Sequence, residues 1–252
     1  MTRTALVTGA SRGIGRAIAQ RLAADGVTVA VHYGTNKTAA LATVAAIEQA
    51  GGQAFPVEAD LDRDDGVDLL FDGLKEGLAG RPLDILVNNA GILGPGIDAS
   101  TADFDRVFRV NVRAPFLIIQ KALDLLPDGG RIINISSGVT WFAIPELVYA
   151  MTKGALNVLG RSLANIVGDR GITVNTVSPG ITRSDMNPWL DEVPGAPEGV
   201  AEMVALGRVG APEEIADAVA FFASPDGRWV TGQVLEVNGG LFLGPKSPVH
   251  HR

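Results

Sequence analysis

The chain has 252 residues, 46% of them hydrophobic, which is enough for one α/β domain with a substantial buried core. Its formal net charge of −7 argues against a nucleic-acid partner or an anionic membrane surface. The absence of cysteine and the presence of only three histidines rule out thiolate chemistry and disfavour a metal site or a Ser-His-Asp hydrolase. No apolar run has the length of a membrane span and no leader-like segment precedes the first strand, so we expect a cytoplasmic protein without a metal.

The first predicted strand covers residues 5–7 and runs directly into a glycine-rich turn. Gly9, Gly13 and Gly15 have the spacing Gly-x-x-x-Gly-x-Gly, and a helical pattern of apolar residues follows. A strand, a glycine turn and a helix N-terminus together form a site for a pyrophosphate, because backbone N–H groups and the helix dipole face the anion. The same glycines also fit a tight turn in an unrelated α/β domain, so the turn alone leaves both interpretations open.

The second predicted strand, at residues 27–31, bears on cofactor choice. In dinucleotide-binding folds an acidic residue at the end of this strand binds the adenosine ribose and selects NAD. No acidic residue occurs from this strand up to Glu48, so the selecting carboxylate is missing. Arg12, Lys37 and, when protonated, His32 are cations suited to bind a 2′-phosphate. The sequence therefore favours NADP(H) as the cofactor, with NAD(H) as the alternative.

Short apolar strands continue to alternate with helical patterns along the chain. The remaining strands are predicted at residues 54–57, 85–87, 131–135, 173–177 and 234–237, and helical spacing covers residues 37–49, 103–126 and 148–168. This alternation predicts a single doubly wound, Rossmann-like α/β domain over residues 1–252, with a seven-stranded parallel sheet. Residues 183–210 interrupt the alternation of strands and helices, and we interpret them as a solvated insertion or as a lid over a substrate site. Residues 245–252 are predicted to form a C-terminal tail.

Tyr149 and Lys153 are four residues apart, about one helical turn, so on a helix the phenol and the ammonium share a face. A positive charge beside a phenol favours the phenolate and lowers the tyrosine pKa towards the range useful for proton transfer. Taken alone, the pair also fits an ordinary solvated helix face.

Together these motifs resemble the short-chain dehydrogenase/reductase family. The resemblance rests on residues 8–15, 88–91, Asn111, Ser137, Tyr149-x-x-x-Lys153, 178–180 and the closing segment 207–240. It implies hydride transfer between a nicotinamide cofactor and a ketone or secondary alcohol, with Tyr149 as general acid or base. Lys153 would lower the tyrosine pKa and hold the nicotinamide ribose, Ser137 would bind the carbonyl oxygen, and Asn111 would help hold a water that relays protons.

The resemblance also implies the cofactor contacts. These are Gly9, Ser11, Arg12, Gly13, Ile14, Gly15, Asp60, Leu61, Asn89, Ala90, Gly91, Tyr149, Lys153, Pro179, Gly180 and Thr182. Two of them also have a structural interpretation: Asn89 is expected to brace neighbouring backbone, and Asp60 fits a turn cap.

The position of the serine departs from the family pattern. The family usually places it thirteen residues before the tyrosine, a spacing that Ser136 has and Ser137 misses by one residue. We favour Ser137, because it ends the predicted strand, and we attribute the spacing to a one-residue deletion in the loop 138–148. Ser136 remains the alternative.

Two further points concern function and assembly. A non-catalytic dinucleotide-binding sensor or scaffold is the main alternative, disfavoured by the complete catalytic set; a sugar epimerase or dehydratase of a longer family is disfavoured by the glycine spacing. Trp141, Phe142 and Ile144 suggest an apolar or aromatic pocket for a small-molecule carbonyl or alcohol substrate, although they also fit a core. The helices that follow position 103 and that carry Tyr149 are apolar on more than one face, which predicts a homo-oligomer, most simply a tetramer.

Overall fold

The computed structural model describes residues 2–244 of the protein, so the predicted tail at residues 245–252 lies outside the described residues. Seven parallel strands form one sheet in the order β3-β2-β1-β4-β5-β6-β7. The strands are β1 (Thr4–Val7), β2 (Thr28–Tyr33), β3 (Gln53–Glu58), β4 (Ile85–Asn88), β5 (Arg131–Ile135), β6 (Thr173–Pro179) and β7 (Val234–Val237). All seven predicted strands are confirmed, with ends shifted by at most two residues. The strand order reverses between β1 and β4, the point at which ligands bind in doubly wound sheets.

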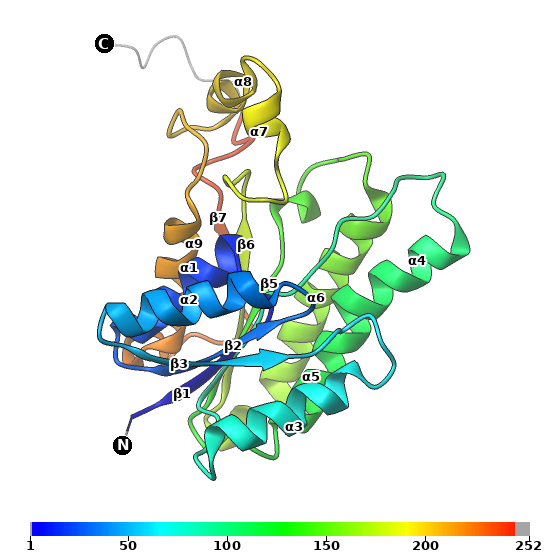
Figure 1. The fold of residues 1–252 in the computed structure, drawn as a ribbon. Helices are drawn as coiled ribbons and strands as arrows, with labels where there is room; N and C mark the ends of the chain where they lie inside the picture. The colour runs from blue at the N-terminus through cyan, green and yellow to red at the C-terminus, as the bar shows by residue number, and fades with distance from the viewer. Residues whose placement is uncertain (1, 245–252) are drawn as a thin grey trace.

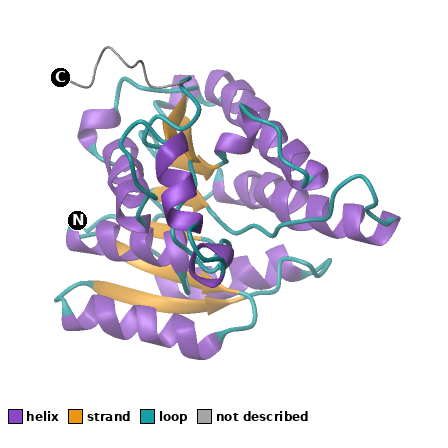
Figure 2. Cartoon of the chain, turned by 90° about the horizontal axis from the view of Figure 1, so that it is seen from above, coloured by secondary structure: helices purple, strands orange, loops and turns teal. Residues whose placement is uncertain are grey.

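Helices cover both faces of this sheet (Figures 1 and 2). One face carries α1 (Gly13–Ala24), α2 (Lys37–Gln49) and α9 (Pro212–Ala223), and the other carries α3 (Gly66–Leu78), α5 (Ala114–Ala122) and α6 (Leu147–Ile166). Successive side chains of a strand point to opposite faces: in β1, Val7 packs in the core under α1, and Leu6 packs in the core under α3. Because both faces of the central strands are buried, β1 and β4 are runs of mainly apolar residues and do not alternate with polar ones.

The helix predicted at residues 103–126 is interrupted. It consists of α4 (Thr101–Phe108), a π-helical segment η1 (Arg109–Arg113) and α5, which ends at Ala122. Ser100 and Asp103 form a reciprocal capping box that starts α4. The π-helical turn carries Asn111, whose side chain is buried. Single π turns within α-helices occur frequently at functional sites. The helix predicted at residues 148–168 is confirmed as α6.

Residues 183–210 leave the sheet after β6 and return to it. Two backbone hydrogen bonds close the base of this excursion: Gly210 donates to the Ile181 carbonyl and Arg183 donates to the Gly210 carbonyl, both at 3.0 Å. Within it, α7 (Trp189–Glu192) and α8 (Ala196–Met203) lie at the top of Figure 1. The excursion packs into a small apolar cluster that it shares with residues outside it, so it is more than a solvated insertion. The cluster contains Leu190, Val200, Val204 and Leu241, with Phe142 packed against it.

Across residues 2–244, no helix is both long enough and apolar enough to cross a membrane.

Candidate active site

The glycine turn after β1 has the geometry of an anion site. Gly9 has φ +65°, and a Cβ at Gly15 would lie 2.2 Å from the Gly9 carbonyl oxygen, so a side chain at either position is excluded. Asn89 donates from Nδ2 to the carbonyls of Thr8 (2.8 Å) and Gly9 (3.2 Å), which confirms that it braces this turn. Arg12 is the N-cap residue of α1 but its side chain does not cap the helix. The first turn of α1 therefore presents its N–H groups to an external anion, and the residues present fit a dinucleotide pyrophosphate.

The loop after β4 lies directly against Lys153, the predicted catalytic lysine. A Cβ at Gly91 would lie 3.4 Å from Asn111 Oδ1 and 3.5 Å from Lys153 Nζ. Ala90, beside it, donates its N–H to Thr8 Oγ1 at 3.0 Å and is thereby fixed to the end of β1. Gly91 thus leaves room beside the ammonium group, where a larger residue would fill the space.

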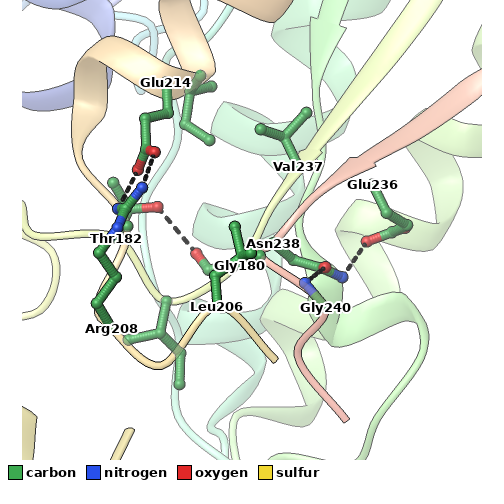
Figure 3. Close-up of a pocket in the computed structure, with 13 residues that line it drawn as sticks. Gly180, Thr182, Leu206, Arg208, Glu214, Glu236, Val237, Asn238 and Gly240 are labelled. Atoms are coloured by element: carbon green, nitrogen blue, oxygen red, sulfur yellow. Dashed lines mark hydrogen bonds and ion pairs between the residues drawn. The ribbon is translucent and has the colours of Figure 1, made fainter. Parts of the chain in front are cut away.

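The end of β6 carries Pro179, Gly180 and Thr182. A Cβ at Gly180 would lie 2.7 Å from the Cα of Asn238, and the buried Thr182 donates to the Gly180 carbonyl at 3.1 Å. Gly180 and Thr182 line a cavity of about 270 Å³ between the ends of β6 and β7 and the first turn of α9 (Figure 3). Within residues 2–244, its lining includes none of the four predicted catalytic residues, so this cavity is separate from the catalytic group.

Asp60 and Leu61 follow β3. Asp60 Oδ1 accepts the N–H of Asp62 at 3.0 Å, so Asp60 caps the turn, and it also lines an open groove of about 700 Å³ with Gly34. The turn-cap interpretation of Asp60 is confirmed, and its contact with the cofactor stays a prediction. Leu61 is buried in the core under α3.

Ser11 and Ile14 complete the predicted set around the glycine turn. The Ser11 carbonyl accepts from the guanidinium of Arg16 at 2.8 Å and from Thr43 Oγ1 at 3.2 Å, so its backbone is fixed from two sides. Ile14 is half-buried against the core under α1.

The prediction that a protonated His32 helps to bind a phosphate is wrong. The ring is buried, Nδ1 accepts the N–H of Gly9 at 3.0 Å, and Nε2 lies 2.9 Å from the carbonyl of Ala59. Nδ1 must be unprotonated to accept, so Nε2–H is the donor and the imidazole is neutral. Burial lowers the pKa of His32 to about 4, which keeps the ring uncharged at neutral pH.

Two carboxylates lie closer to the predicted phosphate site than the sequence indicated. The hydroxyl of Tyr33, the last residue of β2, donates to Glu58 at the end of the neighbouring β3, at 2.8 Å. Asp185, in the excursion, is 3.4 Å from Arg12, with both side chains about 60% exposed. The stretch from the second strand up to Glu48 contains no acid, and these two lie outside it, so they were not found from the sequence. The strand register and the packing of the excursion bring these two carboxylates in.

Tyr149, Lys153 and Ser137 meet at the carboxyl edge of the sheet. Tyr149 and Lys153 are both buried on α6, and Lys153 Nζ lies 5.5 Å from the centroid of the Tyr149 ring. The ammonium donates to the carbonyl of Ile135, at the end of β5, at 2.8 Å. Ser137, two residues further on, hydrogen-bonds to the Tyr149 phenol. The structure therefore brings together three of the four predicted catalytic side chains around one phenol.

The structure also distinguishes the two serines. Ser136 is 2% exposed and donates its hydroxyl to the main-chain carbonyl of Lys153 at 3.2 Å, so it fixes α6 against β5. Ser137 is half-buried and accepts the N–H of Val139 at 3.4 Å in addition to contacting Tyr149. Ser137 is the serine beside the phenol, despite its shortened spacing.

The charge states differ from those expected. Burial raises the pKa of the Tyr149 phenol, and the hydrogen bond from Ser137 only partly opposes this. Burial also lowers the pKa of Lys153 to about 8. The pKa of Tyr149 is therefore raised by burial, whereas the spacing from Lys153 predicted that it would be lowered. The phenol stays protonated at neutral pH and is set up as a proton donor.

A parallel sheet that ends in a glycine turn, an open helix N-terminus and a Tyr-Lys pair defines a dinucleotide-binding oxidoreductase domain. A family model described as enoyl-(acyl carrier protein) reductase matches residues 9–242. A solved short-chain dehydrogenase/reductase variant from Serratia marcescens is 39% identical, with a TM-score of 0.87 over 95% of this chain and 98% of that chain. The protein belongs to the short-chain dehydrogenase/reductase family, as the motifs predicted.

Two other relatives have more specific names. The solved structure of the angucycline C-6 ketoreductase LanV with bound NADP is 48% identical, with a TM-score of 0.90 over 96% of each chain. The 3beta-hydroxysteroid dehydrogenase 1 of Eggerthella lenta is 38% identical over 249 residues, which are 96% of this chain and 95% of that one.

Proposed function

We propose that the protein is an NADP(H)-dependent reductase that converts a ketone to a secondary alcohol, with Tyr149 as the proton donor. The observation that carries this proposal is the buried phenol flanked by the Ser137 hydroxyl and the Lys153 ammonium, beside the open space at Gly91. The raised pKa of Tyr149 suits the reducing direction, because the phenol is protonated when an alkoxide forms and the alkoxide is the stronger base.

Each side chain has one role in this proposal. The Ser137 hydroxyl hydrogen-bonds the carbonyl oxygen of the substrate and positions it at the phenol, which then gives up its proton. Lys153 Nζ holds the nicotinamide ribose hydroxyls and stabilises the phenolate that remains. Asn111 holds the backbone of Ile92, in the loop that follows β4 and borders Lys153. When bound, NADPH supplies the hydride for the carbonyl carbon.

NADP(H) is supported by the sites for its charged groups. The pyrophosphate would lie on the first turn of α1, and the 2′-phosphate would be bound by Arg12, which is exposed, and by Lys37, which is exposed at the start of α2. The Tyr33 phenol holds Glu58 by a hydrogen bond, which satisfies that carboxylate within the sheet edge. The NADP in the LanV structure is consistent with this choice.

For the substrate we propose a bulky, fused-ring ketone. The loops after β4 and β5 meet at the mouth of the site, where a Cβ at Gly96 would lie 2.7 Å from the Pro145 carbonyl. They present Leu93, Ile97 and Trp141 largely exposed, an apolar rim that a flat hydrophobic substrate would cover. The names of an angucycline ketoreductase and a hydroxysteroid dehydrogenase point to the same substrate class.

Consumption of NADPH with ketones of one to four fused rings tests this proposal. We expect turnover to rise with ring number, because more of the apolar rim is covered. Tyr149→Phe should lower kcat by about 10²–10⁴-fold, the usual worth of general acid catalysis, while NADPH binding measured by fluorescence stays close to wild type. Lys153→Ala should lose both turnover and NADPH affinity. Substantial turnover in purified Tyr149→Phe would contradict the catalytic assignment, and NADPH binding without turnover of any ketone would favour the scaffold alternative.

A further inference from the structure

Thr152 lies between Tyr149 and Lys153 on α6, at a position that the Tyr-x-x-x-Lys motif leaves unspecified. Its side chain is fully buried, and its hydroxyl makes two hydrogen bonds. It donates to the main-chain carbonyl of Tyr149 at 2.6 Å, one helical turn back. It also lies 3.1 Å from Nδ2 of Asn111, which belongs to a different helix. The first bond is an ordinary back-bond of a helical threonine, but the second joins two parts of the candidate active site.

The directions of these bonds fix the orientation of the Asn111 amide. A hydroxyl has a single proton, and Thr152 gives it to the Tyr149 carbonyl, so Thr152 can only accept from Asn111. Asn111 must therefore present its NH₂ group to Thr152, and the amide cannot be flipped. Its second N–H donates to the Ile92 carbonyl at 2.9 Å, and its Oδ1 accepts the Ile92 N–H at 2.9 Å.

The Asn111 side chain consequently has both N–H groups committed to protein. It clamps the loop after Gly91 through two bonds to Ile92 and is itself held by Thr152. The clamp matters at this position because a Cβ at Gly91 would lie only 3.5 Å from Lys153 Nζ. A small shift of this loop therefore changes the space beside the ammonium.

We propose that Thr152 is a positioning residue for the reaction: its hydroxyl locks Asn111, and through it the Gly91–Ile92 loop, at the correct separation from Tyr149 and Lys153. This inference rests on the proposed ketone-reductase function. It adds the residue that holds the Gly91–Ile92 loop in place against the helix that carries Tyr149 and Lys153. Thr152 does not touch the reacting atoms and acts only through Asn111.

Thr152→Val replaces the hydroxyl by a methyl group of similar size, and Thr152→Ser keeps the hydroxyl. We expect Thr152→Val to lower kcat at least tenfold, to change KM for NADPH by less than about threefold, and to shift the pH dependence of kcat, because the surroundings of Lys153 change. Thr152→Ser should stay within about twofold of wild type in all three. Thr173→Val is the matched control: Thr173 is also buried, but at the amino end of β6, and its variant should leave kcat and the pH profile unchanged.

Hydrogen–deuterium exchange supplies a readout that does not depend on turnover. Because Asn111 holds the Ile92 N–H, exchange at Ile92 should accelerate in Thr152→Val and not in Thr152→Ser or Thr173→Val. If Thr152→Val folds and shows the kcat and the Ile92 exchange of wild type, the proposal is overturned. A variant that is less stable but keeps both values would overturn it as well. If that variant does not fold, Thr152→Cys decides: it should lose kcat and Ile92 protection relative to Thr152→Ser, and equality of the two would refute the role. A wild-type protein without reductase activity would refute the proposed function, while the exchange result would still report on the clamp.

Discussion

Arg12 is the N-cap residue of α1, a proposed phosphate ligand and the partner of Asp185 in the excursion. Arg12→Ala should weaken NADPH binding by roughly 1.5–3 kcal/mol, the worth of a charge-assisted hydrogen bond, and leave NADH binding nearly unchanged. Titration of both cofactors by protein fluorescence measures the two affinities.

Asp185→Asn is the matched control for Arg12→Ala. It removes the same ion pair but keeps the guanidinium, and exposed pairs contribute at most about 1 kcal/mol. We therefore expect Asp185→Asn to retain NADPH affinity. Equal losses for NADPH and NADH in Arg12→Ala, or a wild-type preference for NADH, would show that Arg12 does not bind the 2′-phosphate.

At the scale of elements, His32 joins three strands: it sits on β2 and hydrogen-bonds the turn after β1 and the residue after β3. Folding lowers the pKa of His32 from 6.5 to about 4. Between about pH 4 and pH 6.5, His32 is therefore mostly protonated in the unfolded chain and mostly neutral in the folded protein. The contribution of His32 to stability is therefore present above pH 6.5 and is lost as the pH falls. Acidification from about pH 7.5 to about pH 5 should remove about 2 kcal/mol through this residue alone.

Urea unfolding at these two pH values, compared between wild type and His32→Asn, measures this effect. Asparagine retains an acceptor for the Gly9 N–H but does not titrate, so the variant should show a pH-dependent loss smaller by about 2 kcal/mol. An identical pH dependence in both proteins would mean that His32 is not the acid-sensitive group.

The elements differ in how far the sequence predicts them. The central strands, buried on both faces, appear as short apolar runs, and the edge strands β3 and β7 also contain short runs of apolar residues, so all seven were located. The π-helical turn at Asn111 was missed, because the helical pattern was assigned to residues 103–126 as one continuous helix and contains no Pro or Gly at Arg109–Arg113 to mark a break. Motif spacing found Tyr149 and Lys153, since both lie on one helix face.

The missed site features depend on contacts between distant segments. Thr152 acts through Asn111, 41 residues earlier in the chain, and Glu58 reaches Tyr33 only through the pairing of β2 with β3. The tyrosine pKa was predicted in the wrong direction, because the sequence shows the lysine four residues away but shows neither the burial nor the bond to Ile135.

At the scale of the whole molecule, exposed apolar side chains of the described residues lie both on α6 and beside the edge strand β7. On α6, Val158 and Ile166 are 63% and 70% exposed, and the edge strand β7 follows Trp229, which is 95% exposed. Two separate faces of this kind suit a dimer of dimers, so we expect a homotetramer. Light scattering at micromolar concentration should give about four times 26.2 kDa.

Val158→Glu places a charge on the α6 face alone and should reduce the tetramer to dimers held by the other face. Glu58→Gln, which alters charge elsewhere on the surface, should leave the mass unchanged. A wild-type mass of 26.2 kDa would contradict the assembly prediction.

The closed base of residues 183–210 has a consequence for how this protein can diversify. Ile181, Arg183 and Gly210 fix the two ends of the excursion together by main-chain bonds, which no side-chain change removes. Between them, Leu190 and Val200 pack in a small apolar cluster with Leu241, which follows β7. The ends of the segment therefore stay in place beside the sheet whatever side chains it carries, so sequence drift, insertion or deliberate grafting between residues 184 and 202 starts from a fixed frame.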